Sequence, residues 1–305
     1  MKTIKYILTC ALLAGYGITS VSYAQSDKAS FGFDVDAGYH SDSNVGIADI
    51  DSNSGESDTA VKIGLGVNAE IPLGERFGVR VGYDFDDTAY QELSEFDLSL
   101  HHGVAEISTD FAGFGAAVAV DRYVANLDGE EYLGMTQVSP SLSRLFGSSL
   151  FARIAYMDAT KEYDLLSNRD ASNEAMRVDV YWLLDGMNRY IALGMQTSDE
   201  NAIDDELDFE SVQSMLTYGQ SLRFSKVQVK LKTQLKLENR DYLNVTEAIQ
   251  DTRRDDRLRA SLSAAIPLPG NFELKGIVEH ARTESNLDSA DTDKLSYGVS
   301  VSASF

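Results

Sequence analysis

The chain has 305 residues, of which 48 are acidic and 26 are basic, giving a formal net charge of -22 at pH 7. This acidic excess argues against a nucleic-acid partner, because such a partner requires a basic surface. Aromatic residues make up 10% of the chain and prolines number only four, which argues against an intrinsically disordered chain.

The first 24 residues have the layout of a secretory signal peptide. Lys2 and Lys5 precede an apolar run from Tyr6 to Ile18, and Ser22-Tyr23-Ala24 fits a small-x-small cleavage site. The apolar run is too short for a membrane-spanning helix. The one cysteine, Cys10, lies in this segment, so the mature chain would have no disulfide and no thiolate metal site. We therefore expect residues 1–24 to be a signal peptide and residues 25–305 to form a single domain.

Fourteen segments after residue 24 alternate apolar and polar side chains with a period of two, a pattern that only a β-strand can use. In the last, Leu295 to Phe305, every odd position is apolar and every even position is Gly or Ser. A segment containing Pro140 is the weakest, because proline removes one hydrogen bond of a strand ladder. In chain order the predicted strands are 31–40, 61–71, 77–85, 96 to about 110, 114–120, 132–142, 150–156, 176–184, 191–195, 212–222, 227–237, 258–266, 272–278 and 295–305.

The breaks between these segments alternate in length. Six are short turns, such as Pro72-Leu73-Gly74-Glu75, and seven are long and acidic, of which 198–210 is the most acidic. Tight turns on one side and long loops on the other are typical of outer-membrane barrels. Such a sheet must close, because lipid cannot satisfy the polar groups of a free edge. The sequence therefore predicts an all-β fold, a 14-stranded antiparallel up-and-down transmembrane β-barrel in the outer membrane.

Aromatic residues also follow the two kinds of break, as in the interfacial girdles of membrane barrels. A soluble β-sandwich or solenoid would show the same alternation, but it explains neither the loop asymmetry nor the terminal phenylalanine. Beside the short turns lie Phe77, Phe111, Phe114, Phe146, Phe224, Phe272 and Phe305; near the long breaks lie Tyr39, Tyr83, Tyr156, Tyr163 and Tyr242.

If the apolar positions face lipid, the alternate positions face a lumen in which the charges are segregated. The predicted basic wall consists of Arg223, Lys230, Lys232, Lys236, Arg257 and Arg259, and the predicted acidic side of Asp34, Asp36, Glu70, Asp84 and Asp97. These charges could line a water-filled passage whose field filters polar solutes, or they could pair and plug the lumen.

The strand number and the small lumen-facing residues favour the passage. Fourteen strands lie between the roughly eight that side chains fill and the roughly 16 to 18 that leave an open channel. Gly64, Gly66 and Gly298 would leave space where the first and last strands meet. We therefore predict a narrow porin-like passage for small polar or charged solutes.

The sequence does not predict an enzyme. None of His40, His101, His102 and His280 lies in a Gly-x-Ser-x-Gly context or in a two-histidine metal spacing. The acidic breaks contain no twelve-residue calcium loop. We expect no catalytic residue, no metal site and no cofactor.

The end of the chain resembles the closing strand of Gram-negative outer-membrane barrels, where a terminal Phe is characteristic. This resemblance implies that Tyr297 and Phe305 take part in barrel closure, and that Phe305 acts as a signal for the outer-membrane barrel assembly machinery. The lipid bilayer and lipopolysaccharide are the other partners expected of such a barrel.

Three shorter stretches resemble the barrel domain of surface lipoprotein assembly modifiers: Gly38 to Val45, Arg254-Asp255-Asp256 and Glu284-Ser285-Asn286. That family is associated with a fourteen-stranded barrel that helps to move lipoproteins to the cell surface. The resemblance implies an alternative function, as a barrel component of surface lipoprotein assembly or export, with a surface lipoprotein as partner. The first strand is expected only a few residues after the cleavage site, so the family's periplasmic repeat region is not expected here.

Overall fold

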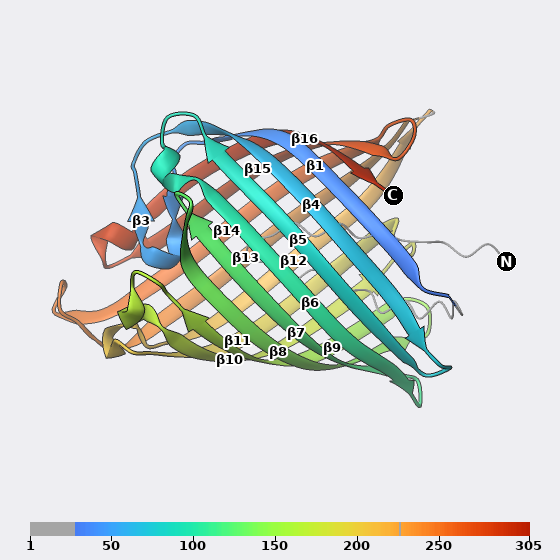
Figure 1. The fold of residues 1–305 in the computed structure, drawn as a ribbon, viewed down its shortest axis with the longest axis horizontal. Helices are drawn as coiled ribbons and strands as arrows, with labels where there is room; N and C mark the ends of the chain where they lie inside the picture. The colour runs from blue at the N-terminus through green and yellow to red at the C-terminus, as the bar shows by residue number, and fades with distance from the viewer. Residues whose placement is uncertain (1–27, 226) are drawn as a thin grey trace.

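The described part of the chain is a closed antiparallel barrel of 14 strands (Figure 1). The computed structural model describes residues 28–305 except residue 226, so the expected signal peptide lies outside the described residues. Each strand pairs with its neighbours in the chain, and the first pairs with the last. The barrel strands are β1 (Ser30–Asp42), β4 (Asp58–Leu73), β5 (Phe77–Tyr90), β6 (Leu98–Phe111), β7 (Phe114–Leu127), β8 (Glu130–Phe146), β9 (Leu150–Glu162), β10 (Ala171–Leu183), β11 (Arg189–Ala202), β12 (Phe209–Phe224), β13 (Val227–Thr246), β14 (Asp251–Pro267), β15 (Phe272–Ser285) and β16 (Thr292–Ser304).

The two ends of the barrel differ. We call the end that carries residues 74–76, 112–113 and 147–149 the turn end, and the opposite end the loop end. The loop end carries a small hairpin between β1 and β4, formed by β2 (Gly46–Ile47) and β3 (Ser52–Asn53) around the 3-10 turn η1 (Ala48–Ile50). Four further 3-10 turns lie there, namely η2 (Ser94–Phe96), η3 (Ser167–Arg169), η4 (Asp205–Leu207) and η5 (Asp288–Ala290).

Each of the 14 predicted segments corresponds to one strand, although residues 96–97, 184 and 305 fall outside the strands. Most strands run beyond their predicted ends toward the loop end. The predicted break 238–255 is mostly ladder, because β13 and β14 remain paired from Asn239 with Asp256 to Thr246 with Asp251. The break after β7 is a two-residue turn at Asp128-Gly129. Two of the seven long breaks are thus mostly strand, and the other five keep loops of 6 to 15 residues between their strand extensions. Their two faces are both polar, so no hydropathy pattern marks them.

The strand with Pro140 forms, but it lacks the ladder hydrogen bond that proline cannot donate. Pro140 lies opposite Val118 of β7. On the other side, the ladder between β8 and β9 passes from Val138 with Asp158 to Ser141 with Ala155 and skips the proline.

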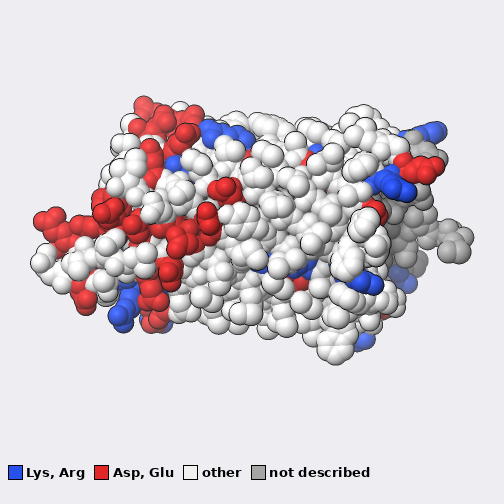
Figure 2. Space-filling view, turned by 90° about the horizontal axis from the view of Figure 1, so that it is seen from below, with Lys and Arg blue, Asp and Glu red and all other residues white. Residues whose placement is uncertain are grey.

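The outer face of the barrel is apolar in its middle and charged at its ends. Leu193 on β11, Leu262 on β14 and Val299 on β16 are more than half exposed on this face. Figure 2 shows few charged side chains in the middle of this face, many acidic ones at the loop end, and both basic and acidic ones at the turn end. An apolar belt of this extent is what a membrane requires, and soluble monomers rarely expose one. Among the described residues, no helix is long and apolar enough to cross a membrane.

The aromatic residues agree with this belt except at two tyrosines. All seven predicted phenylalanines are exposed at the turn end, and Tyr39, Tyr83 and Tyr156 are exposed on the outer face. Tyr163 and Tyr242 are buried inside the mouth at the loop end, so their assignment to the outer girdle was wrong. Tyr242 lies on the inward parity of the extension of β13, which the sequence pattern did not reveal.

Candidate functional site: the lumen and its mouth

The predicted basic residues lie on the inner faces of three adjacent strands. Arg223 comes from β12; Lys230, Lys232 and Lys236 come from β13; Arg257 and Arg259 come from β14. Carboxylates of the same region accompany them. Lys230 pairs with Glu273 at 2.6 Å, Lys236 with Glu238 at 3.3 Å and Arg259 with Glu279 at 3.6 Å. The basic wall is therefore interrupted by acidic groups on β13 and β15.

Four of the five predicted acidic residues lie on the inner face on the other side of the seam where β1 meets β16. Asp34 and Asp36 come from β1, Glu70 from β4 and Asp84 from β5. Asp86 of β5 joins them, and it was missed because the predicted strand ended at Phe85.

The glycines of β4 do not leave the open space that we expected from the sequence. A Cβ on Gly66 would lie 2.9 Å from an oxygen of Asp84, and one on Gly64 would lie 3.2 Å from an oxygen of Asp86. Carboxylates of β1 and β5 thus close over the backbone of β4. Gly298 is covered in the same way by the ring of His40.

The assignment of Asp97 to the lumen wall was wrong. Asp97 lies between η2 and β6, where its carboxylate accepts a hydrogen bond from the backbone N–H of Tyr90 at 2.6 Å. In β6 the inward positions are even, because Leu100 and Val104 are buried inside while Ile107 is exposed outside. Apolar residues on both faces of β6 reversed the predicted phase of this strand.

A histidine links the acidic side to the next strands. The ring of His102 on β6 lies 2.9 Å from a carboxylate oxygen of Asp121 and 3.5 Å from one of Asp84. The ring also stacks on Tyr123, with ring centroids 4.3 Å apart. This arrangement holds one imidazole between two carboxylates in the lumen wall.

Residues 43–57, which we call the mouth loop, cross the loop end of the barrel (Figure 1). Val45 and Ile47 of the loop are buried. The loop is anchored beside the seam, where the backbone N–H of Ser43 donates to Leu295 at 2.9 Å, and the side chain of Asn53 donates to the carbonyl of Ser289 at 3.1 Å. The mouth loop therefore packs into the barrel rather than projecting from it.

An arginine cluster holds the tip of the mouth loop. Arg253 of β14 donates two hydrogen bonds to the carboxylate of Asp51, at 2.7 and 2.9 Å, and Arg169 of η3 donates a third at 3.0 Å. Arg253 also donates twice to Asp255 of its own strand, at 2.8 and 2.9 Å. The Arg253 guanidinium lies 4.5 Å from the centre of the Tyr242 ring.

This cluster is buried and charged. The side chain of Arg253 is 2% exposed and that of Asp255 is 0% exposed. Burial would raise the pKa of the Asp51 carboxyl, but the hydrogen bonds and charges of Arg253 and Arg169 outweigh burial and lower this pKa below its ordinary value. Asp51 is therefore ionised at neutral pH and makes charge-assisted hydrogen bonds.

Sequence reasoning missed this cluster, although a signal was present. Arg253, Asp255, Arg257 and Arg259 alternate with a period of two, so they share one face of a strand. The first two fell in a segment that was interpreted as a loop.

A second buried network joins the strands at the seam. Asp42 at the end of β1 accepts hydrogen bonds from Tyr90 of β5 at 2.6 Å, from His40 at 2.9 Å and from the Ser296 hydroxyl. Lys294 of β16 lies 3.0 Å from the same carboxylate. One buried acid thus connects both strands of the seam to β5.

The chain end completes the ring at the turn end. Phe33 and Phe305 exchange backbone hydrogen bonds at 2.8 and 3.1 Å, and their rings lie 6.2 Å apart. Tyr297 faces outward and pairs with Ser41 of β1. A role for Phe305 as an assembly signal stays a prediction.

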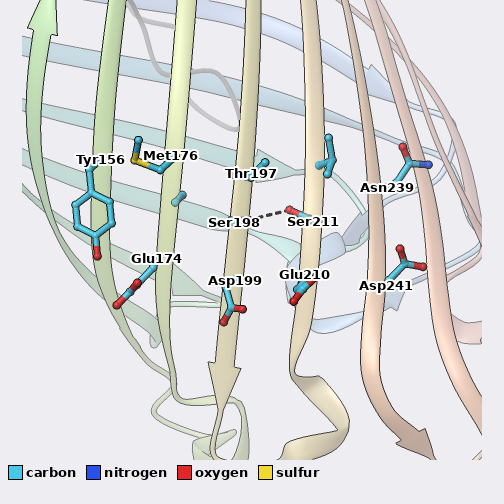
Figure 3. Close-up of a pocket in the computed structure, with 12 residues that line it drawn as sticks. Tyr156, Glu174, Met176, Thr197, Ser198, Asp199, Glu210, Ser211, Asn239 and Asp241 are labelled. Atoms are coloured by element: carbon cyan, nitrogen blue, oxygen red, sulfur yellow. Dashed lines mark hydrogen bonds between the residues drawn. The ribbon is translucent and has the colours of Figure 1, made fainter.

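The outer wall carries a row of carboxylates at the edge of the apolar belt (Figure 3). Glu174, Asp199, Glu210 and Asp241 are paired neighbours on β10 to β13. They line a shallow groove with Tyr156 and Met176. Within the described residues, no group of three or more His, Cys, Asp or Glu side chains is placed to hold a metal ion.

Known structures match the fold, although no family model and no curated protein matches the sequence. An anion-selective porin from Comamonas acidovorans is similar with a TM-score of 0.55 and 10% sequence identity, over 91% of this chain and 99% of that chain. OmpT, an outer membrane protein of Vibrio cholerae, is similar with a TM-score of 0.54 and 7% identity, over 92% of this chain and 100% of that chain. The chain therefore has the fold of outer-membrane β-barrel proteins, as its sequence predicted.

Proposed function

We propose that this protein lies in the outer membrane and forms a narrow porin-like passage for small polar or charged solutes, without enzymatic activity. The observation that carries the proposal is the opposite chemistry of the two faces of one closed sheet. The outer face is an apolar belt, and the inner face holds charges that a packed apolar core would not accept. The similarity to a porin in fold supports the same function.

The lumen differs along its length. Near the turn end, the side chains of Lys230 and Glu273 are 53% and 30% exposed, and in the middle of β14 that of Arg259 is 36% exposed. These groups keep contact with solvent although they face inward. At the loop end, Val45 and Ile47 of the mouth loop and Arg253 and Asp255 of the arginine cluster are buried. The proposed passage is therefore wet on the turn side and constricted on the loop side.

Replacing Lys230, Lys232 and Lys236 together by Glu should weaken or reverse any anion preference of the passage. The three substitutions change the sign of one lumen wall, and the fixed charge of a pore selects the ions that enter it. The measurement is the reversal potential of the purified protein in planar bilayers under a salt gradient.

The matched control replaces Arg76, Arg254 and Arg282, which are exposed outside the lumen, by Glu. It makes the same change in net charge and should leave the selectivity as in the unmodified protein. Unchanged selectivity in the lysine variant would remove the basic wall from the mechanism. A protein that stays silent in bilayers, even after residues 46–53 of the mouth loop are deleted, would contradict the passage itself.

The lipoprotein-assembly alternative, and the contacts with lipopolysaccharide and the barrel assembly machinery, stay predictions. Loss of a surface lipoprotein on deletion of the gene, together with silence in bilayers, would favour the alternative.

A further inference from the structure

The mouth loop reaches across the barrel. Asp51 follows β1 by only nine positions of chain, yet its carboxylate contacts residues of two distant parts of the ring. Arg253 belongs to β14, which is separated from β1 by β16 and β15. Arg169 lies between β9 and β10, on the side of the ring opposite to β1 and β4. A loop held at both places spans the mouth.

Asp51 occupies a site that is built for a carboxylate. The planar guanidinium of Arg253 presents two parallel N–H groups to the two oxygens of Asp51, which is the fork geometry that arginine offers to carboxylates. Arg169 adds a donor from the opposite wall, and its other terminal nitrogen donates to the carbonyl of Asp49 at 3.0 Å. Arg253 is also held by Asp255 of its own strand, so its part of the site does not need a solute to be formed.

We propose that Arg169 and Arg253 form a binding site for small carboxylate solutes at the mouth of the passage, and that Asp51 fills this site while the mouth is closed. A solute carboxylate that takes the place of Asp51 releases the loop tip. The binding of the solute and the opening of the mouth are then one event. The inference rests on the passage proposed above and names the class of solute that would open it.

Two features make the exchange of Asp51 for a solute feasible. Arg253 keeps both hydrogen bonds to Asp255 when Asp51 leaves, so no buried guanidinium is left without a partner. Asp51 borders a polar cavity of about 30 Å³, which is lined by Arg169, Arg240 and Tyr163 and also by the carboxylates of Asp49 and Glu200. Donors for the remainder of a small anion are therefore close to the site.

Asp51 competes as a tethered ligand. A group held by a short flexible segment has an effective concentration of roughly millimolar, so a free carboxylate should act at millimolar levels on the unmodified protein. Without the Asp51 carboxylate, a free carboxylate should bind the site at lower concentrations.

Calorimetric titration of succinate into the full chain in detergent tests the site. Asp51→Gly suits the backbone, because Asp51 has φ of 54°, a conformation that glycine adopts freely. We expect this variant to bind succinate about tenfold to a hundredfold more tightly than the unmodified protein, since the tethered carboxylate of Asp51 no longer has to be displaced from the arginines. Asp51→Asn should also bind succinate more tightly than the unmodified protein.

Two further variants make the result specific. Glu56→Gln removes an exposed carboxylate of the same loop and should leave the affinity unchanged. Asp51→Gly combined with Arg169→Ala should lose the gain, while Arg253 and Asp255 remain to keep the wall folded. Equal affinity in the unmodified protein and in Asp51→Gly, or no binding in either, would overturn the inference.

Planar-bilayer recording then separates the inference from the function on which it rests. Succinate should raise the open probability of the unmodified protein, and Asp51→Gly should be open without it; sorbitol, which has no charge, should change neither. Succinate binding that follows the expected order, with bilayers silent for every variant, would overturn the passage and leave the carboxylate site. Channels that open equally with and without Asp51 would overturn the role of the loop as a closure.

Discussion

Replacing Asp42 by Ala is expected to lower the free energy of unfolding by about 3–5 kcal/mol, the usual cost of removing one partner from a buried ion pair. The carboxylate is 1% exposed and accepts from Tyr90 and His40 at 2.6 and 2.9 Å, while Lys294 lies 3.0 Å away. Its loss leaves the half-buried Lys294 ammonium, the half-buried Tyr90 hydroxyl and the buried Ser296 hydroxyl without their acceptor at the seam. Urea unfolding of the detergent-folded protein, followed by circular dichroism, measures the change.

Asp293 provides the matched control on the last strand. It pairs with His280 at 3.1 Å, but its side chain is 65% exposed, so Asp293→Ala should cost less than about 1 kcal/mol. If the two variants unfolded at the same urea concentration, the Asp42 network would stabilise the closed barrel no more than the exposed pair of Asp293 and His280 does.

The second large effect concerns the apolar belt. Leu262 of β14 faces outward between Thr233 and Val278 and is 53% exposed. Leu262→Lys should lower the free energy of unfolding from lipid vesicles by about 2–4 kcal/mol, because it places a cation on the lipid face near the bilayer midplane. The measurement is urea-dependent unfolding in vesicles.

The neighbouring residue supplies the control. Ser261 faces inward and is paired with Glu279 of β15, so Ser261→Lys places the same cation beside a lumen carboxylate. Its effect should stay within about 1 kcal/mol. Equal costs at both positions would mean that the two faces of β14 do not meet different environments.

The strands of the barrel could be predicted from the sequence wherever one face of a strand is in contact with hydrocarbon. There the outward position must be apolar, so residues such as Leu262 and Val299 show which face of their strand is outward. The number of strands can be predicted from segments with such residues. Beyond the belt both faces are wet, so this constraint disappears. The extensions that carry Arg253 and Tyr242 were accordingly taken for loops.

The ion pairs between residues far apart in the chain could not be predicted from the sequence. Asp51 is 118 residues from Arg169 and 202 residues from Arg253 in the chain, and no local pattern connects an acid in a turn with arginines on other strands. The prediction that Asp97 lies on the lumen wall was wrong for a different reason. Leu100 and Val104 are apolar residues that face inward, and they outweighed the weaker outward signal of β6.

In the membrane barrel, successive side chains of one strand face lipid and water in turn. Nitroxide labels on single cysteines at positions 262 and 261, in the protein reconstituted into vesicles, test it directly. At 262 the label should collide more with oxygen, which concentrates in hydrocarbon, than with a water-soluble nickel complex, and at 261 the order should reverse. The same accessibility at both positions, or a nickel preference at 262, would contradict the membrane barrel and the passage that depends on it.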